Sequence, residues 1–302
     1  MESGLIFDIK RYCINDGPGI RATIFFKGCP LHCRWCHNPE SIAPQIQKLH
    51  AAARCISCDV CVKGCPGGAC VLSSGGIVTD PALCTLCGRC AAACPTLATQ
   101  LSGRSYRVAE LLALLEKERH LFDSSGGGVT CSGGEPLLQA PFLRGFLRAC
   151  GRQQIHRAVD TSGLAPWEVV ETIAAHTDLF LYDLKLINCE RHRRYTGVDN
   201  TLILANLQQL AVIGAAVQIR LPLIGGVNLD DDNIEATARF VAGLAGEKKE
   251  VNLLPFHDVA RGKDLKLGQE RDLTGMYTPT TADLEGVIAI FAAHGLTATF
   301  GG

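Results

Sequence analysis

Cysteine spacing is the feature that constrains this chain most strongly. Eleven of its sixteen cysteines lie between Cys29 and Cys94 in three motifs of fixed spacing. The chain begins MESGLIFDIKRY, which is unlike a secretory signal peptide, and no apolar run reaches the roughly 18 residues that suggest a membrane span. We therefore expect a cytoplasmic protein without membrane contact, and in that reducing compartment clustered cysteines bind metal or act in redox chemistry more often than they form disulfides.

Two of the motifs form an internal repeat. Residues 55–66 read CISCDVCVKGCP and residues 84–95 read CTLCGRCAAACP, so both follow Cys-x2-Cys-x2-Cys-x3-Cys-Pro. This is the spacing of two-cluster bacterial ferredoxins, in which the fourth cysteine of each run ligates the other cluster. A pair of four-cysteine zinc sites is the alternative, but zinc ribbons usually use paired knuckles with a longer gap. The predicted 4Fe-4S ligands are Cys55, Cys58, Cys61 and Cys94 for one cluster, and Cys84, Cys87, Cys90 and Cys65 for the other.

The remaining motif stops at three cysteines. Residues 28–38 read GCPLHCRWCHN, which spaces Cys29, Cys33 and Cys36 as Cys-x3-Cys-x2-Cys. Zinc and iron–sulfur sites usually close with four protein ligands. A cubane cluster on three cysteines leaves one iron with an open position, which can chelate a small molecule as an open catalytic zinc binds water. The other five cysteines fit no ligand spacing and are expected to be inert: Cys13, Cys70, Cys131, Cys150 and Cys189.

The region from residue 101 to residue 302 alternates strand-like and helix-like segments. Short apolar stretches rich in β-branched or aromatic residues are typical of buried parallel strands, and the amphipathic stretches between them are typical of covering helices. This alternation predicts an α/β fold, a barrel or partial barrel of about six units. The expected strands are 22–26, 127–132, 156–161, 179–185, 217–222 and 250–255. The expected helices are 108–122, 140–153, 167–176, 200–214, 230–246 and 281–295.

Polar residues gather where these strands end. Residues 132–135 (SGGE) close one strand, residues 160–162 (DTS) the next, and residues 183–185 (DLK) the one after. His257 follows the sixth strand. Because chemistry in such folds lies at the carboxyl ends of the strands, we expect these residues to share one rim.

The three-cysteine motif and its surroundings resemble the signature of the glycyl radical enzyme activating enzymes, a group of the radical S-adenosylmethionine (SAM) enzymes. Residues 16–41 (DGPGIRATIFFKGCPLHCRWCHNPES) carry most of the resemblance, and SGGEP (132–136), YDLK (182–185) and LPFH (254–257) extend it over nearly the whole chain. The repeat is typical of their longer subgroup, which includes the activators of choline trimethylamine-lyase, 4-hydroxyphenylacetate decarboxylase, glycerol dehydratase and isethionate sulfite-lyase.

The resemblance implies a partial (β/α)6 TIM-like radical SAM barrel with an inserted ferredoxin-like domain that holds two clusters. Residues 1–45 would start the barrel and carry the catalytic cluster loop. Residues 46–100 would form the insert, and residues 101–302 would complete the barrel. With the catalytic cluster, the chain would hold three 4Fe-4S clusters and SAM.

The resemblance also implies the reaction. The enzyme would cleave SAM reductively and abstract hydrogen from one glycine of a partner glycyl radical enzyme, giving a glycyl radical, 5′-deoxyadenosine and methionine. Reduced flavodoxin or ferredoxin would supply the electron, and the two inserted clusters would relay it or help to dock the donor or the partner. The net charge of −1 gives no indication of a nucleic-acid partner, and a monomer is expected. The alternatives are another radical SAM enzyme that acts on a small molecule, and a multi-cluster electron-transfer protein.

Residue roles follow from the resemblance as well. Cys29, Cys33 and Cys36 would ligate the catalytic cluster, where SAM binds. The SAM contacts would be Trp35 and His37 beside the adenine, Gly133 and Gly134 near the methionine amino group, Asp183, Leu184 and Lys185 near the carboxylate and ribose, and His257 at the ribose or adenine. Asp16 and Arg21 would engage the glycine loop of the partner.

Several residues named above also have ordinary alternatives, since a Gly-Gly pair is a common turn and a lone histidine such as His257 is most often an ordinary loop residue. Asp183 and Lys185 could form a simple ion pair at the rim, and Trp35 could serve only in packing. Asp160, at the end of its strand, could help the SAM site or cap the following helix.

Overall fold

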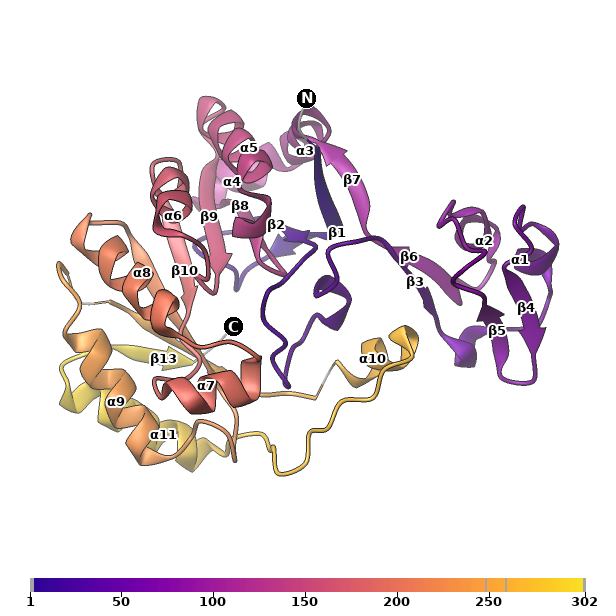
Figure 1. Ribbon diagram of the computed structural model, residues 1–302. Coiled ribbons are helices and arrows are strands. Elements are labelled where there is room, and N and C mark those ends of the chain that lie inside the picture. Colours follow the sequence, from indigo (N-terminus) through magenta and orange to yellow (C-terminus); the bar gives the residue numbers. More distant parts are fainter. Residues whose placement is uncertain (1–2, 248, 259, 301–302) are drawn as a thin grey trace.

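A single large sheet organises the chain, whose computed structural model describes residues 3–247, 249–258 and 260–300. The first two residues of the expected domain 1–45 and the last two of the expected domain 101–302 therefore lie outside the described residues, as do residues 248 and 259. The strands of this sheet are β1 (Ser3–Cys13), β2 (Arg21–Phe26), β7 (Arg104–Arg107), β8 (Gly128–Gly133), β9 (His156–Thr161), β10 (Leu179–Asp183), β11 (Val217–Leu223), β12 (Val251–Pro255) and β13 (Ala298–Phe300). Their order is β13-β12-β11-β10-β9-β8-β2-β1-β7, so β13 and β7 are the two edges of an open, curved sheet (Figure 1).

The strand–helix alternation is confirmed. All six expected strands are present and pair in parallel, from β2 through β8 to β12. The sequence predicts six parallel strands, but the described residues contain one more, because β13 pairs in parallel with β12. Its three residues are too short to give a periodic signal. At the other edge, β1 and β7 are antiparallel additions.

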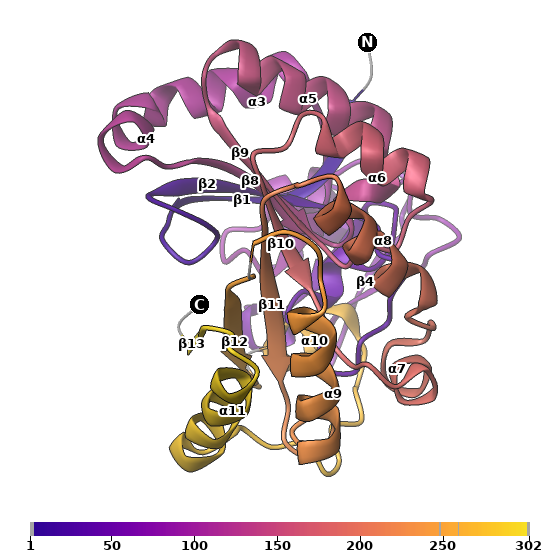
Figure 2. The ribbon, with the colours of Figure 1, turned by 90° about the vertical axis from the view of Figure 1, so that its left-hand side faces the viewer.

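Helices follow the curve of the sheet along one of its faces, which Figure 2 shows from the side. They are α3 (Val108–Leu115), α4 (Arg119–Ser125), α5 (Ala140–Arg152), α6 (Trp167–Ala174), α8 (Thr201–Val212), α9 (Asp231–Ala242) and α11 (Thr281–Ala293). Two further helices lie elsewhere: the end of α7 (Cys189–Thr196) hydrogen-bonds to the backbone of residues 32–34, and α10 (Arg261–Leu267) packs against the 3-10 turn Pro39–Ser41. The helix expected at 108–122 is divided into α3 and α4 by a 3-10 turn. The short polar helices α7 and α10 carry too few apolar residues to be predicted. Within the described residues, no helix has both the length and the apolar character needed to cross a bilayer.

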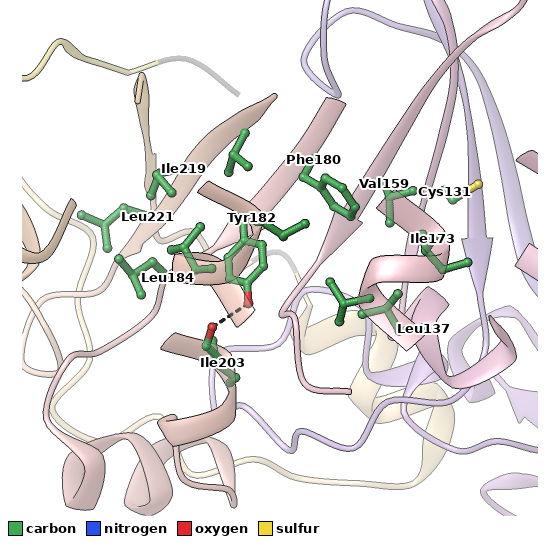
Figure 3. Close-up of a cluster of buried hydrophobic side chains, with 14 of the residues drawn as sticks. Cys131, Leu137, Val159, Ile173, Phe180, Tyr182, Leu184, Ile203, Ile219 and Leu221 are labelled. Carbon is green, nitrogen blue, oxygen red and sulfur yellow. Dashed lines mark hydrogen bonds between the residues drawn. The ribbon is translucent and has the colours of Figure 1, made fainter. Parts of the chain in front are cut away.

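The core lies between the sheet and these helices. Along β11, Val217, Ile219, Leu221 and Leu223 are buried, and the residues between them point to the opposite face. Phe180 and Tyr182 of β10 join the same core, and the Tyr182 hydroxyl donates to the Ile203 carbonyl of α8 at 2.7 Å (Figure 3). The alternation therefore leaves Arg220 and Pro222 on the inner face, which is where the candidate site lies.

Residues 47–102 form a lobe beside the barrel, attached by a two-stranded ribbon (Figure 1). The ribbon pairs β3 (Gln47–His50) with β6 (Thr99–Ser102). Beyond it lie α1 (Val60–Lys63), the hairpin of β4 (Cys70–Ser73) and β5 (Gly76–Thr79), and α2 (Arg89–Ala93). The internal repeat is visible in the backbone, since Ser57 and Asp59 before α1 and Leu86 and Gly88 before α2 all have positive φ.

Candidate active site

The three-cysteine loop follows the buried strand β2 and is held by other segments. The Cys29 amide donates to the Ile42 carbonyl at 3.0 Å, and the Cys36 amide donates to the Cys33 carbonyl at 3.0 Å. Arg271, after α10, donates to the Cys36 carbonyl at 2.6 Å. The loop therefore has a fixed course across the end of the sheet.

This loop borders a cavity of about 430 Å³ at the carboxyl ends of the parallel strands. The cavity brings together nearly all the residues that the sequence assigns to the catalytic site. Those that line it are Cys29, Cys33, Trp35, Cys36, His37, Gly133, Gly134, Asp183, Lys185 and His257. The sequence indicates no individual role for several other residues of the lining, among them Ser132, Thr161, Ser162, Arg220 and Phe256.

The three thiols suit an electropositive metal cluster. Burial is the main cause that raises the pKa of all three, and it raises the pKa of Cys33 to about 12. Buried thiols of this kind become thiolate ligands when a metal supplies the compensating positive charge. The lining holds three cysteines and no fourth, so the residues present fit a 4Fe-4S cluster with one open iron.

The two glycines of the SGGE turn let β8 approach the cysteine loop closely. A Cβ on Gly134 would lie 2.2 Å from the Gly28 carbonyl oxygen. Gly133 has a φ of +109°, and a Cβ added to it would lie 2.5 Å from the Phe26 backbone nitrogen. A side chain at either position would push the turn away from the cavity wall. The chain's own backbone thus needs both glycines at this point.

Glu135, the last residue of the turn, is expected at the rim from the sequence, but nothing in the sequence indicates what its carboxylate does. Its fully buried carboxylate accepts hydrogen bonds from the Leu137 amide (3.1 Å), the Thr161 hydroxyl (2.7 Å) and both the amide and hydroxyl of Ser162 (2.9 and 2.6 Å). Burial raises the pKa of Glu135 although these hydrogen bonds act to lower it. The carboxylate joins the turn after β8 to the turn after β9, and both turns line the cavity.

Charged side chains are concentrated on the inner wall. The Lys185 ammonium donates to the Asp183 carboxylate at 2.6 Å. Burial lowers the pKa of Lys185, but the charge of Asp183 more than offsets this, so the pKa is raised and the ammonium is kept. Both side chains line the cavity, so the pair is more than a surface contact.

Asp160 points into the cavity and does not cap a helix. It accepts a hydrogen bond from the Ser132 hydroxyl at 2.6 Å and lies 3.4 Å from the Arg220 guanidinium. Pro166, without a side-chain hydrogen bond, is the residue at the start of α6. Burial raises the pKa of Asp160 to about 6, against the lowering effect of Arg220.

This shift predicts a pH-dependent stability. A carboxyl whose pKa is raised from 3.8 to about 6 on folding stabilises the protein below pH 4, and that contribution is lost as the pH rises through 6. Relative to Asp160→Asn, the wild type should lose about 1–2 kcal/mol between pH 5 and pH 8. Anaerobic unfolding of both proteins across this range measures the difference, and a constant difference would contradict the assignment.

Two expectations about individual side chains need correction. Leu184 lies in the hydrophobic core and does not line the cavity, because alternate residues of an extended segment face opposite sides. Arg21 is fully buried and donates to the Thr130 hydroxyl (2.7 Å), the Val129 carbonyl (2.6 Å) and the Pro18 carbonyl (2.9 Å). It holds the Gly-Pro-Gly loop against β8 and is not exposed to a partner.

The insert contains two smaller cavities, each bordered by four cysteines drawn from both repeats. The first, here called the Lys48 cavity, is lined by Lys48, Cys65, Cys84, Cys87 and Cys90, with Cys70 beside them. The second, the His50 cavity, is lined by His50, Cys55, Cys58, Cys61 and Cys94. These are the two crossed sets that the spacing predicts. No group of three His, Cys, Asp or Glu side chains in the described part of the chain could hold a single metal ion.

Known proteins match this chain along most of its length. Residues 23–241 match the Radical SAM superfamily. The trans-4-hydroxy-L-proline dehydratase activating enzyme of Clostridioides difficile is 39% identical, and the alignment covers 99% of each chain. The choline trimethylamine-lyase activating enzyme of Oleidesulfovibrio alaskensis is 41% identical over 95% of this chain and 94% of that protein. The crystal structure of a domain of pyruvate-formate lyase-activating enzyme from Bacteroides vulgatus is 41% identical, with a TM-score of 0.51, and covers 58% of this chain and 99% of that one.

The fold is that of the radical SAM enzymes. It has a parallel sheet covered by helices and a three-cysteine cavity at the carboxyl edge of that sheet, and the matches agree with it. The chain belongs to the radical SAM superfamily and, within it, to the glycyl radical enzyme activating enzymes, since activating enzymes 35–41% identical match 86–99% of its length. Enzymes of this family use a 4Fe-4S cluster and SAM to activate a partner glycyl radical enzyme.

Proposed function

We propose that this chain uses Cys29, Cys33 and Cys36 to hold the catalytic cluster and the surrounding cavity to hold SAM. The observation that carries the proposal is the cavity itself, which has three cysteines, two close-packed glycines and a buried Asp183–Lys185 pair in one lining. When bound, the cluster supplies the electron that splits SAM into methionine and a 5′-deoxyadenosyl radical. The hydrogen abstracted from the partner comes from a glycine Cα, which leaves a glycyl radical on the partner.

The residues of the chain orient SAM and exclude water from it. Gly133 and Gly134 would let the backbone of the turn after β8 approach the methionine end of SAM, and Lys185 would offer an ammonium to the SAM carboxylate. Trp35 and His37 also line the cavity, and Trp35 is buried in a cluster with Leu186 and Phe256. No general base is needed, because the step is hydrogen-atom abstraction and not proton transfer.

The insert is proposed to hold two further 4Fe-4S clusters, which gives three in total. The support is the pair of cavities bordered by crossed sets of four cysteines, the arrangement of two-cluster ferredoxins. In this proposal residues 46–100 are a ferredoxin-like domain inserted between residues 1–45 and 101–302 of the barrel. A reduced flavodoxin or ferredoxin is the proposed electron donor, and the enzyme acts as a cytoplasmic monomer.

Electron paramagnetic resonance tests the function. The reconstituted, reduced enzyme is incubated with SAM and one candidate partner at a time: choline trimethylamine-lyase, trans-4-hydroxy-L-proline dehydratase or isethionate sulfite-lyase. We expect the doublet of a glycyl radical with at least one partner, and no doublet when SAM is omitted. If SAM is cleaved to 5′-deoxyadenosine while every partner stays silent, an enzyme acting on a small molecule is favoured. If SAM is not cleaved at all, the chain is an electron-transfer protein.

A further inference from the structure

The two cavities of the insert lie at different distances from the barrel. Along the β3–β6 ribbon, Gln47 pairs with Ser102, Lys48 with Leu101 and His50 with Thr99. Lys48 and Leu101 border the Lys48 cavity, whereas His50 and Thr99 border the His50 cavity. The two positions on β3 are two residues apart, so they face the same side and are separated by about 7 Å along the strand.

Lys27 shows which end of the ribbon is attached to the barrel. This buried residue at the end of β2 directly precedes the three-cysteine loop, and its ammonium donates to the Glu40 carbonyl at 2.6 Å. The same ammonium donates to the Gln47 side chain at 3.1 Å and lies 3.5 Å from the Ser102 hydroxyl. The Lys48 cavity is therefore the one next to the catalytic loop, and the His50 cavity is the outer one.

A positive charge is fixed at the inner cavity. The Lys48 ammonium donates to the Thr79 hydroxyl at 2.6 Å and to the Cys70 sulfur at 3.1 Å. These two contacts come from the β4–β5 hairpin, which holds the half-buried side chain against the cavity. No carboxylate forms an ion pair with Lys48 among the described residues. Lys48 is less exposed than Arg89, the other cation that borders this cavity, and its charge acts on whatever the four surrounding cysteines hold.

The equivalent position at the outer cavity has no such charge. The ring of His50 accepts a hydrogen bond at Nε2 from the Ile77 amide at 3.2 Å, and its Nδ1 lies 3.2 Å from the Thr99 hydroxyl. An Nε2 that accepts an amide hydrogen carries no proton, so this imidazole is neutral. The charged residue that borders the outer cavity is Asp59, whose carboxylate is paired with Lys63 at 2.9 Å.

Charge beside an iron–sulfur cluster changes its reduction potential. Reduction adds one negative charge to the cluster, and a nearby cation stabilises that form. We propose, on the basis of the proposed two-cluster insert, that Lys48 raises the potential of the inner cluster above that of the outer one and so directs electrons toward the barrel. Cys55, Cys58, Cys61 and Cys94 would hold the outer cluster, which would accept one electron from a reduced one-electron donor such as flavodoxin, and Cys65, Cys84, Cys87 and Cys90 would hold the inner cluster, which would pass that electron toward the barrel. At each step one centre is oxidised as the next is reduced.

Redox titration followed by electron paramagnetic resonance tests the proposal, with the Cys36→Ala chain as the background so that only the insert contributes. Lys48→Met should lower the reduction potential of the inner cluster and leave the other nearly unchanged. The expected shift of its reduction equilibrium is at least tenfold toward the oxidised form, and a tenfold shift corresponds to about 59 mV for a one-electron couple. The second cluster should change by less than a third of this. Lys48→Arg, which keeps the charge, should keep the wild-type potential. Lys63→Met, which removes an ammonium that is 76% exposed, is the matched control and should leave the inner cluster unchanged.

The outcomes separate this inference from the proposed function. If the background protein binds no iron in the insert, the proposal of three clusters is wrong. If it binds about eight irons and Lys48→Met shifts neither potential, or shifts both equally, the cluster count stands and the role of Lys48 is wrong. The change in potential caused by Lys48→Met should persist in a protein whose outer site is removed by Cys58→Ala. It should disappear in a protein whose inner site is removed by Cys87→Ala. The opposite pattern would reverse the assignment and overturn the inference.

Discussion

Cys36→Ala should abolish SAM cleavage while leaving about eight irons bound to the chain. The thiol is one of three that border the 430 Å³ cavity, and no fourth cysteine is present in that lining to replace it. The eight cysteines of the internal repeat border the two separate cavities of the insert. Iron analysis and chromatography of 5′-deoxyadenosine measure the two effects in the same sample.

Two other cysteines supply the controls. Cys189→Ala changes a half-buried thiol at the start of α7, outside every motif, and should leave both iron content and SAM cleavage unchanged. Cys58→Ala changes a ligand of the proposed outer cluster and should lower activation without removing SAM binding. Survival of SAM cleavage in Cys36→Ala would show that the catalytic site is elsewhere. Loss of SAM binding in Cys58→Ala would show that the clusters do not have separate roles.

Glu135→Ala should cost about 3–5 kcal/mol of folding stability. The substitution leaves two buried amides and two buried hydroxyls without their acceptor, in a place that is closed to solvent. It also frees the turns after β8 and β9, both of which line the cavity, so the dissociation constant for SAM should rise at least tenfold. Anaerobic unfolding in urea and equilibrium binding of SAM measure these two quantities.

Two variants show whether the hydrogen bonds are the cause. Glu135→Gln keeps the shape and one acceptor oxygen, so it should lose about half as much stability as Glu135→Ala. Glu168→Ala removes an exposed glutamate of α6 and should stay within about 0.5 kcal/mol of the wild type. A wild-type affinity for SAM in folded Glu135→Ala would mean that the carboxylate does not position the cavity.

The strong patterns of the sequence predict much of the fold. Alternating apolar strands and amphipathic helices lead to the parallel sheet because each strand is long enough to show its burial pattern. β13 has three residues and leaves no such pattern, and α7 and α10 are short and polar. Cysteine spacing also predicts which four cysteines surround each cavity of the insert, because ligand spacing depends on local loop geometry.

Contacts between distant segments could not be predicted in the same way. Arg21 seemed available to a partner, but its guanidinium is satisfied by β8, more than one hundred residues away in sequence. Arg220 reaches the cavity only because β11 packs its other face on the helices. The part played by Glu135 depends on two turns meeting across the sheet. The sequence does place Glu135 directly after two glycines at the end of a strand, which indicates a position near the site but not its hydrogen-bond partners.

If the three-cysteine site has an open position that SAM occupies, labelled SAM must lie in contact with the cluster there. The reduced enzyme, carrying Cys58→Ala and Cys87→Ala to simplify the signals from the insert, is examined by electron paramagnetic resonance before and after SAM labelled with ¹⁷O in its carboxylate is added. We predict that the spectrum changes and that hyperfine coupling to the labelled oxygen appears. An unchanged spectrum with no coupling would show that all four irons of the cluster have protein ligands and that SAM does not bind at this site.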